Sequence, residues 1–173
     1  MPATTKFKEI SPFELNENPF KIIGKDWFLI TAGVKEDYNT MTGGWGMMGV
    51  LWQKAVVCIY IRPTRHTWNF TEKYQEFTLC FFEEKYREIL NYCGSVSGKN
   101  QDKVKECGLT LMESKSGNLY FEEARLVMEC RKIYVSDLDP GLFLESSIEH
   151  HYPLKDYHRM YVGEIFSVLT ESE

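Results

Sequence analysis

The segment spanning residues 61–67 (IRPTRHT) carries side chains suited to holding an anion. Arg62 and Arg65 provide planar guanidinium groups, and Thr64 and Thr67 provide hydroxyls. Guanidinium groups bind phosphate through paired, charge-assisted hydrogen bonds. A helix is expected to begin here, and its first N–H groups and positive dipole end would favour the same ligand. The segment therefore predicts a phosphate site, with pairing to surface carboxylates as the alternative for the arginines.

A second segment, residues 39–52 (NTMTGGWGMMGVLW), has no charged side chain and combines glycines with large apolar groups. Glycine lets backbone N–H and C=O groups come close to a ligand. Tryptophan and methionine provide a polarizable surface that suits a flat ring. The alternative is a loop that crosses the core and packs its aromatic side chains there. The glycines disfavour a helix, and strand alternation is broken, so residues 35–46 are expected to form a turn-rich connection.

One predicted strand, residues 55–61 (AVVCIYI), lies between these two segments. Its β-branched and aromatic residues favour a buried strand. At the rise of a β-strand it spans about 23 Å. A flat ring with a phosphate tail could therefore contact both segments if neighbouring strands bring them together.

Residues 39–70 (NTMTGGWGMMGVLWQKAVVCIYIRPTRHTWNF) resemble the flavin reductase-like, FMN-binding split-barrel family. Members of this family carry Asn-x-Met-Thr-x-x-Trp, then a strand, then Arg-Pro-Thr-Arg-x-Thr. The resemblance continues through NYCGSVSGKNQDK, YFEEARLVMECRKIY and YHRMYVGEI, and so covers about residues 25–170. It implies a Greek-key split barrel that forms a homodimer, with FMN near the subunit interface.

The resemblance assigns two groups of residues to FMN. The residues matched to the flavin ring are Asn39, Met41, Thr42, Gly44, Trp45 and Gly46, followed by Met47 and Met48 in the same pocket. The residues matched to the phosphate are Arg62, Thr64, Arg65 and Thr67, joined by Ser97 and Lys99 from a Ser-Gly-Lys loop. Family members often have serine or asparagine at the position of Gly44, so a side-chain hydrogen bond to the flavin is lost there or replaced by backbone. The alternative for Lys99 is that it is a solvated loop residue with no contact to the phosphate.

The activity implied is that of an oxidoreductase. It would pass electrons from NADH or NADPH through FMN to a flavin or another small acceptor. The flavin carries out that chemistry and the protein supplies position and electrostatics, so no side chain is expected to be catalytic. Two alternatives remain open. One is a flavoredoxin-like electron carrier that a protein partner reduces, and the other is a member that has drifted to haem or to a scaffolding role.

Bulk composition narrows the class of protein. The 173 residues fit a single domain, predicted over residues 25–173, after an irregular N-terminal arm over residues 1–24 that contains three prolines. The net charge of -5 gives no global basic field for nucleic acid or an anionic membrane. The N-terminus lacks the apolar core of a signal peptide, and no apolar run is long enough for a membrane span. A cytoplasmic protein is expected.

Cysteine and histidine usage argues against a metal site. The five cysteines are far apart and include no CxxC pair, which favours reduced thiols over a zinc site. The adjacent histidines of residues 149–153 (EHHYP) have no matching ligand set and are interpreted as a surface loop. His158 falls in a predicted strand and is interpreted as structural. Cys93, at a helix end, could be reactive, although packing is the default.

Most of the elements that must position these segments are strands. Strands are expected over residues 26–34, 55–61, 76–82, 109–113, 118–123, 124–138 and 158–170. Short helices are expected over residues 67–75 (with Thr67 as N-cap), 83–94 and 101–108, and a loop or short helix over 140–153. Helices do not alternate regularly with strands, which disfavours a doubly wound parallel sheet. The pattern predicts a mainly β protein with a closed or nearly closed antiparallel barrel. Together with the family resemblance, this implies a Greek-key antiparallel split β-barrel with inserted short helices.

Overall fold

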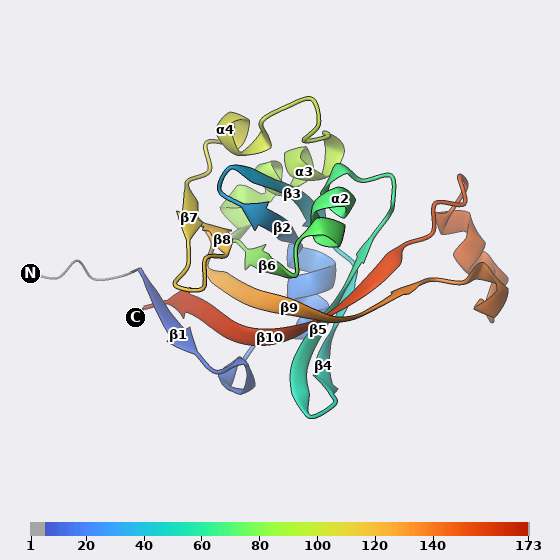
Figure 1. Cartoon of the computed structure of the whole chain (residues 1–173), viewed down its shortest axis with the longest axis horizontal. Helices are drawn as coiled ribbons and strands as arrows, with labels where there is room; N and C mark the ends of the chain where they lie inside the picture. The colour runs from blue at the N-terminus through green and yellow to red at the C-terminus, as the bar shows by residue number, and fades with distance from the viewer. Residues whose placement is uncertain (1–5, 173) are drawn as a thin grey trace, which may run out of the picture.

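The computed structural model describes residues 6–172, which are organised around one curved antiparallel sheet (Figure 1). The strands are β1 (Phe7–Ile10), β2 (Phe28–Val34), β3 (Asp37–Gly43), β4 (Gly46–Leu51), β5 (Lys54–Ile61), β6 (Glu76–Phe81), β7 (Leu111–Glu113), β8 (Leu119–Phe121), β9 (Leu126–Asp137) and β10 (Arg159–Glu171). The helices are η1 (Pro12–Glu14), α1 (Pro19–Lys21), η2 (Ile22–Asp26), α2 (His66–Lys73), η3 (Glu84–Tyr86), α3 (Arg87–Ser95), α4 (Lys103–Cys107), η4 (Pro140–Leu142) and η5 (Ser146–His151). None of these helices is long and apolar enough to span a membrane.

The strand order explains how the sheet becomes a barrel. The order is β3-β2-β6-β9-β10-β5-β4, with β1 also paired to β10 and with β7 and β8 in a separate hairpin. The two end strands, β3 and β4, are consecutive in the chain and are joined only by Gly44 and Trp45. The sheet must therefore curl until its two ends meet at this link. This arrangement is an antiparallel split barrel, and the predicted mainly β fold is confirmed.

Both faces of β2 are buried, which accounts for its continuous apolar sequence. Successive residues of a strand point to opposite faces. Phe28 and Ile30 pack into the barrel core, whereas Leu29 packs into a second cluster that includes Cys93 of α3. β2 thus has the barrel interior on one face and the layer that includes α3 and α4 on the other, and it also pairs with β3.

The expected turn-rich connection over residues 35–46 is wrong, because most of it is β3. This strand pairs with β2 along its whole length, from Asp37 opposite Val34 to Gly43 opposite Phe28. Its sequence does not read as a strand because its buried side chains include polar ones. Thr40 is buried, and its hydroxyl donates a hydrogen bond of 3.2 Å to a carbonyl oxygen of β2. The apolar stretch that follows is β4, at the other end of the sheet.

The N-terminal arm is also more regular than expected. Residues 1–5 lie outside the described part of the chain, but β1 pairs with β10 through four residue pairs. Pro12 and Pro19 each stand in the first turn of a short helix, where the missing N–H costs nothing. The other predicted strands and helices are confirmed, with ends shifted by a few residues.

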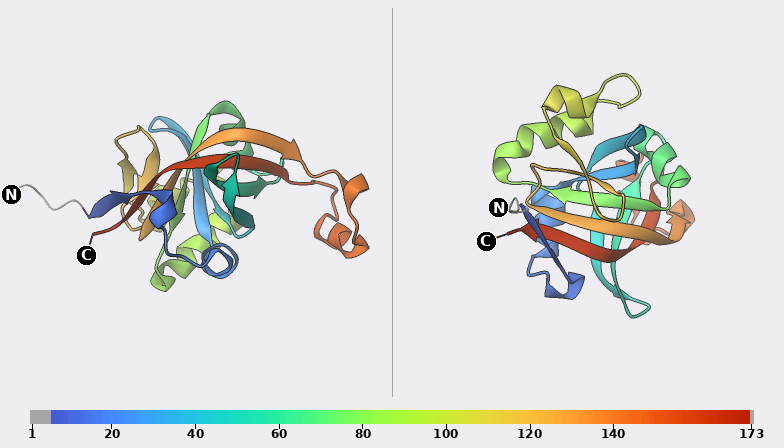
Figure 2. Two further views of the ribbon diagram at one scale, coloured as in Figure 1. Left: turned by 90° about the horizontal axis from the view of Figure 1, so that it is seen from below. Right: turned by 60° about the vertical axis from the view of Figure 1, so that its left-hand side comes forward.

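The connection between β9 and β10 projects away from the barrel at the end opposite the termini (Figures 1 and 2). It comprises residues 138–158 and contains η4 and η5. We call this segment the arm; it is distinct from the N-terminal arm of residues 1–24. Its base is packed rather than free, since Tyr152 and His158 are buried, whereas Leu142 and Leu144, earlier in the segment, are exposed. The arm therefore extends one wall of the barrel beside the β3–β4 link.

Candidate functional site

A small cavity of about 120 Å³, the polar cavity, lies at the beginning of α2. Its lining includes Asn39, Met41, Thr64, Arg65, Thr67 and Ser97. Arg65 is the N-cap of α2 and makes no side-chain cap hydrogen bond. The first N–H groups of the helix are therefore left without a side-chain partner, and with the guanidinium they favour an anionic ligand.

A larger cleft of about 500 Å³, the ring cleft, continues from the polar cavity. Its lining includes Met41, Thr42, Gly44, Trp45, Arg62 and Arg65, together with Trp27, Asn91, Gly94, Ser95 and His158. Met41, Arg65, Gly94 and Ser95 line both spaces, so the two are contiguous. The fold therefore brings the glycine-rich segment and the arginine-rich segment together around one opening.

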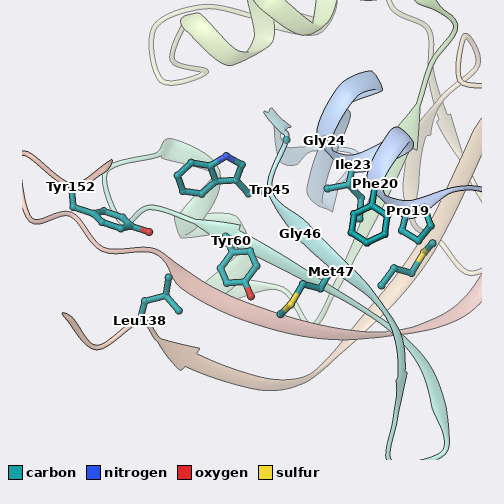
Figure 3. Close-up of a pocket in the computed structure, with 12 residues that line it drawn as sticks. Pro19, Phe20, Ile23, Gly24, Trp45, Gly46, Met47, Tyr60, Leu138 and Tyr152 are labelled. Atoms are coloured by element: carbon teal, nitrogen blue, oxygen red, sulfur yellow. The ribbon is translucent and has the colours of Figure 1, made fainter. Parts of the chain in front are cut away.

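A third space, the apolar cleft, has a volume of about 720 Å³ and adjoins the ring cleft through Gly44, Trp45 and Tyr60. The side chains of Trp45, Tyr60 and Met47 lie between α1 on one side and the base of the arm on the other (Figure 3). Gly46 and Met48 line the same cleft. Except for Lys99, every candidate residue from the sequence lines one of these three spaces. Lys99 lines a different pocket.

The two arginines of the phosphate segment have different surroundings. Arg62 donates to Asp156 at 2.9 Å and to the carbonyl of His151 at 2.7 Å, and lies 5.0 Å from the ring centroid of Tyr152. Pairing with a carboxylate, the alternative for these arginines, is thus observed for Arg62. Arg65 makes only a long hydrogen bond, 3.4 Å, to a backbone carbonyl of α3. Its guanidinium therefore keeps most of its donors for a ligand.

Asp156 ties the arginine segment to the arm. Besides Arg62 it accepts a hydrogen bond of 3.3 Å from the hydroxyl of Thr64. Burial acts to raise the pKa of Asp156, but the hydrogen bonds from these two side chains and the charge of the guanidinium outweigh it and hold the pKa below its usual value. Arg62 and Thr64 therefore position the arm.

Asn39 and Thr67 connect the two segments directly. The Asn39 Nδ2 donates to the Thr67 hydroxyl at 2.8 Å, and both side chains are buried. The prediction that Thr67 is the N-cap of its helix is wrong, because α2 begins at His66 with Arg65 as the cap. Gly98 packs against this pair, and a Cβ there would lie 1.9 Å from the Asn39 Oδ1. Only glycine lets this loop approach so closely.

Sequence reasoning missed Lys103, a buried cation in the wall of the polar cavity. Its exposed fraction is 5%, and its ammonium donates to the carbonyls of Thr40 at 3.0 Å and Cys93 at 2.9 Å. Burial lowers the pKa of Lys103, and no carboxylate within residues 6–172 pairs with it. One of its three donors stays unused. A buried cation without an anion fits a phosphate ligand.

His158 borders the ring cleft as a neutral ring. Its Nδ1 is hydrogen-bonded to the Tyr152 hydroxyl at 2.8 Å, and its centroid lies 5.0 Å from that of Trp45. Burial, aided by the nearby guanidinium of Arg62, lowers the pKa of His158 from 6.5 to about 4. The imidazole is therefore uncharged near neutral pH and serves as a packing and hydrogen-bonding group.

The depressed pKa of His158 predicts a loss of stability in mild acid. The unfolded chain binds more protons than the folded chain between pH 6.5 and about 4, so the free energy of unfolding should fall as the pH drops through this window. Chemical denaturation at a series of pH values would measure this. In the variant His158→Gln the slope should become shallower. An unchanged slope would contradict the assignment of this effect to His158.

The described residues contain no cluster of three or more His, Cys, Asp or Glu side chains placed to hold a metal ion. All five cysteines are free, and Cys93 lies 3.9 Å from Cys107, sulfur to sulfur. Burial raises the pKa of Cys93 to about 12, which keeps this thiol protonated and poorly nucleophilic.

Comparison with protein families gives a match to the model of the flavin reductase like domain over residues 23–173. The chain belongs to this family. Comparison with curated proteins gave no match. Among solved structures, an FMN-binding protein from Thermus thermophilus is similar with a TM-score of 0.67 and 20% identity, covering 84% of this chain and 71% of that one. A flavoredoxin from Methanosarcina acetivorans has a TM-score of 0.66 and 22% identity, covering 85% and 69%.

A third similar structure is an FMN-binding domain of a flavin reductases-like enzyme from Shewanella baltica. Its TM-score is 0.70 at 14% identity, and the match covers 95% of this chain and 77% of that one. At such identities the similarity concerns the fold. The family match and these neighbours agree with the split barrel described above.

Proposed function

We propose that this flavin reductase-like protein binds FMN and uses it to oxidise NADH or NADPH, with a flavin or another small molecule as acceptor. The observation that carries the proposal is the continuity of the polar cavity with the ring cleft. The first space has unpaired positive charge and the second has glycine backbone and an indole, which are the features that a phosphate and a flat ring require.

The residues have distinct roles in this proposal. Arg65, Lys103 and the first turn of α2 bind the phosphate, with the hydroxyls of Thr64 and Ser97 lining the same cavity. Asn39 of β3 and Thr67 of α2 join the two elements that border this cavity through their hydrogen bond. No ionised side chain among these is expected to transfer a proton.

The ring end is shaped by apolar groups and backbone. Met41, Thr42 and the Gly44–Trp45 link line the space proposed for the flavin ring, and His158 borders it as a neutral group. When bound, FMN supplies the two-electron chemistry that accepts hydride from a reduced nicotinamide. The apolar cleft, lined by Met47 and Met48 among others, excludes water beside the ring and gives the second reactant a place to enter.

The test is spectroscopic. The protein as purified should show flavin absorbance, and mass analysis of material released by heating should identify FMN. Under anaerobic conditions, NADH or NADPH should bleach the flavin band. Bleaching by neither nucleotide would overturn the enzyme and leave the electron carrier, which a protein partner would reduce. Absence of flavin binding under added FMN would overturn the proposal as a whole.

We further propose that the functional unit is a cytoplasmic homodimer in which residues 25–173 act as one domain. The five free thiols support a reducing compartment. Met47, Val50 and Trp52, along β4 and its turn, are 53%, 67% and 58% exposed, and this concentration of apolar surface beside the site is typical of an interface. Light scattering coupled to gel filtration should give twice the chain mass, and a monomer mass at micromolar concentration would refute the dimer.

A further inference from the structure

Trp27 has a backbone conformation that is rare for any residue except glycine. It stands between η2 and β2, with a φ of 62° and a ψ of 176°. This combination lies in a region of φ/ψ space that is almost restricted to glycine, and it persists only where the surrounding structure holds the residue in place. Strain of this kind is concentrated at ligand sites. The position of the Trp27 side chain therefore calls for a physical explanation.

Arg87, the first residue of α3, holds both the side chain of Trp27 and the chain before it. Its guanidinium carbon lies 4.7 Å from the centroid of the indole ring, within the range of a cation–π contact. The same guanidinium donates a hydrogen bond of 2.8 Å to the carbonyl of Lys25. These two contacts fix the direction in which the strained residue presents its indole.

Gly44 leaves the space that the indole of Trp27 occupies. A Cβ on Gly44 would lie 2.8 Å from the Cδ1 of Trp27 and 3.0 Å from its Nε1, and the first of these distances is shorter than Cβ contacts in proteins. Any side chain at position 44 would thus push the indole away. Gly44 and Trp27 both line the ring cleft, so the glycine of the β3–β4 link and the strained tryptophan form one feature of its wall.

The indole N–H of Trp27 is a donor that has no hydrogen-bond partner within residues 6–172. It is also accessible, because the one buried side-chain nitrogen or oxygen without a partner in the described part of the chain belongs to Trp68. Its Nε1 lies beside Gly44 in the wall of the ring cleft. An indole can donate a hydrogen bond and cannot accept one through nitrogen. The ligand group that suits this position is therefore a hydrogen-bond acceptor.

We propose that Trp27 donates a hydrogen bond from its indole N–H to an acceptor atom of the flavin ring, and that this contact requires glycine at position 44. The inference rests on the proposed function, because it needs a flavin ring in the ring cleft. Reduction places more negative charge on the acceptor atoms of the ring, so a fixed donor stabilises the reduced flavin more than the oxidised one. Trp27 thus raises both the affinity for flavin and the midpoint potential of the bound flavin.

The first test removes the donor and keeps an aromatic ring. Trp27→Phe retains a ring for Arg87 to stack on but has no N–H. FMN and riboflavin, titrated into flavin-free protein and followed by fluorescence quenching, should each bind about fivefold more weakly, because the lost hydrogen bond is at the ring and not at the phosphate. The midpoint potential of bound FMN, measured by equilibration with redox dyes, should become more negative.

Trp68→Phe is the matched control for this variant. The indole N–H of Trp68 also lacks a partner within the described residues, but Trp68 lines none of the three spaces of the site. The same substitution there should leave both affinities and the midpoint potential unchanged.

A second test measures the dependence of Trp27 on Gly44. Gly44→Ala should weaken the binding of both flavins, because its Cβ displaces the indole. In a Trp27→Ala background the space beside position 44 is empty, so the same change should have almost no further effect on either affinity. Equal losses from Gly44→Ala in the two backgrounds would overturn the coupling.

Three results for Trp27→Phe would overturn the inference while leaving FMN binding intact. The first is unchanged affinity for both flavins. The second is a loss of affinity with an unchanged midpoint potential, which would make Trp27 a packing residue only. The third is a loss equal to that of Trp68→Phe. Failure of wild-type protein to bind either flavin would instead refute the proposed function itself, so the two failures are distinguishable.

Discussion

Replacing Arg65 with alanine is expected to weaken FMN binding by about 2 kcal/mol, or about thirtyfold in Kd, and to leave riboflavin binding nearly unchanged. The reason is that Arg65 lines the polar cavity and spends only one long hydrogen bond on the protein itself. Riboflavin lacks the phosphate, so its affinity should not depend on the guanidinium of Arg65. Fluorescence titration with the two ligands measures both affinities.

Arg62→Ala provides the comparison for this experiment. Its guanidinium is held by Asp156 and by a carbonyl of the arm, so its loss should displace the arm and weaken FMN and riboflavin to a similar extent. Arg131→Ala is a control for loss of an exposed charge remote from the cavities, and should affect neither ligand. Equal losses of FMN and riboflavin in Arg65→Ala would contradict the phosphate assignment.

The largest effect on stability is expected for Phe28→Ala, which should lower the free energy of unfolding by about 3–5 kcal/mol. Phe28 is 0% exposed, and its ring lies 5.3 Å from that of Phe81 inside the barrel. It also packs under Gly43 at the end of β3, where a Cβ would approach its ring to 2.6 Å. Removal of the ring leaves a cavity beneath the site. Urea denaturation followed by circular dichroism gives the value.

Phe20→Ala is the matched control, because the same side chain is 87% exposed at the edge of the apolar cleft. Its free energy of unfolding should change by less than about 0.5 kcal/mol. If Phe28→Ala were as mild as Phe20→Ala, the barrel core would have to relax around the missing ring, and the packing argument would fail.

The sequence predicted the strands that bury runs of apolar side chains and missed β1, β3 and β4, each for a different reason. β2, β5 and β6 have runs of apolar residues and were found. β3 buries Asn39 and Thr40 through hydrogen bonds to other elements, which no local pattern reveals. β4 is an edge strand with mixed exposure, and its glycines resemble loop composition. β1 needs its partner β10, more than a hundred residues away, to be a strand.

For the site, the sequence located the segments that line the cavities, but it did not show which residues of each segment face a cavity and which pair with other parts of the protein. Arg62 and Arg65 look equivalent in the motif, and only the folded arm shows that one of them faces Asp156. Lys103 and Lys105 are likewise indistinguishable in a charged stretch, yet one is buried beside the polar cavity and the other is exposed. Such differences depend on contacts between distant segments, so a single sequence does not contain them in readable form.

The central place of β10 has a consequence for how the protein is made. β10 joins β9 to β5, and within the described sheet no other strand connects the β5–β4 pair to the remaining strands. During translation it is the last of the described strands to leave the ribosome. We therefore expect the nascent chain to complete the sheet that carries the proposed flavin site only after this segment has been synthesised.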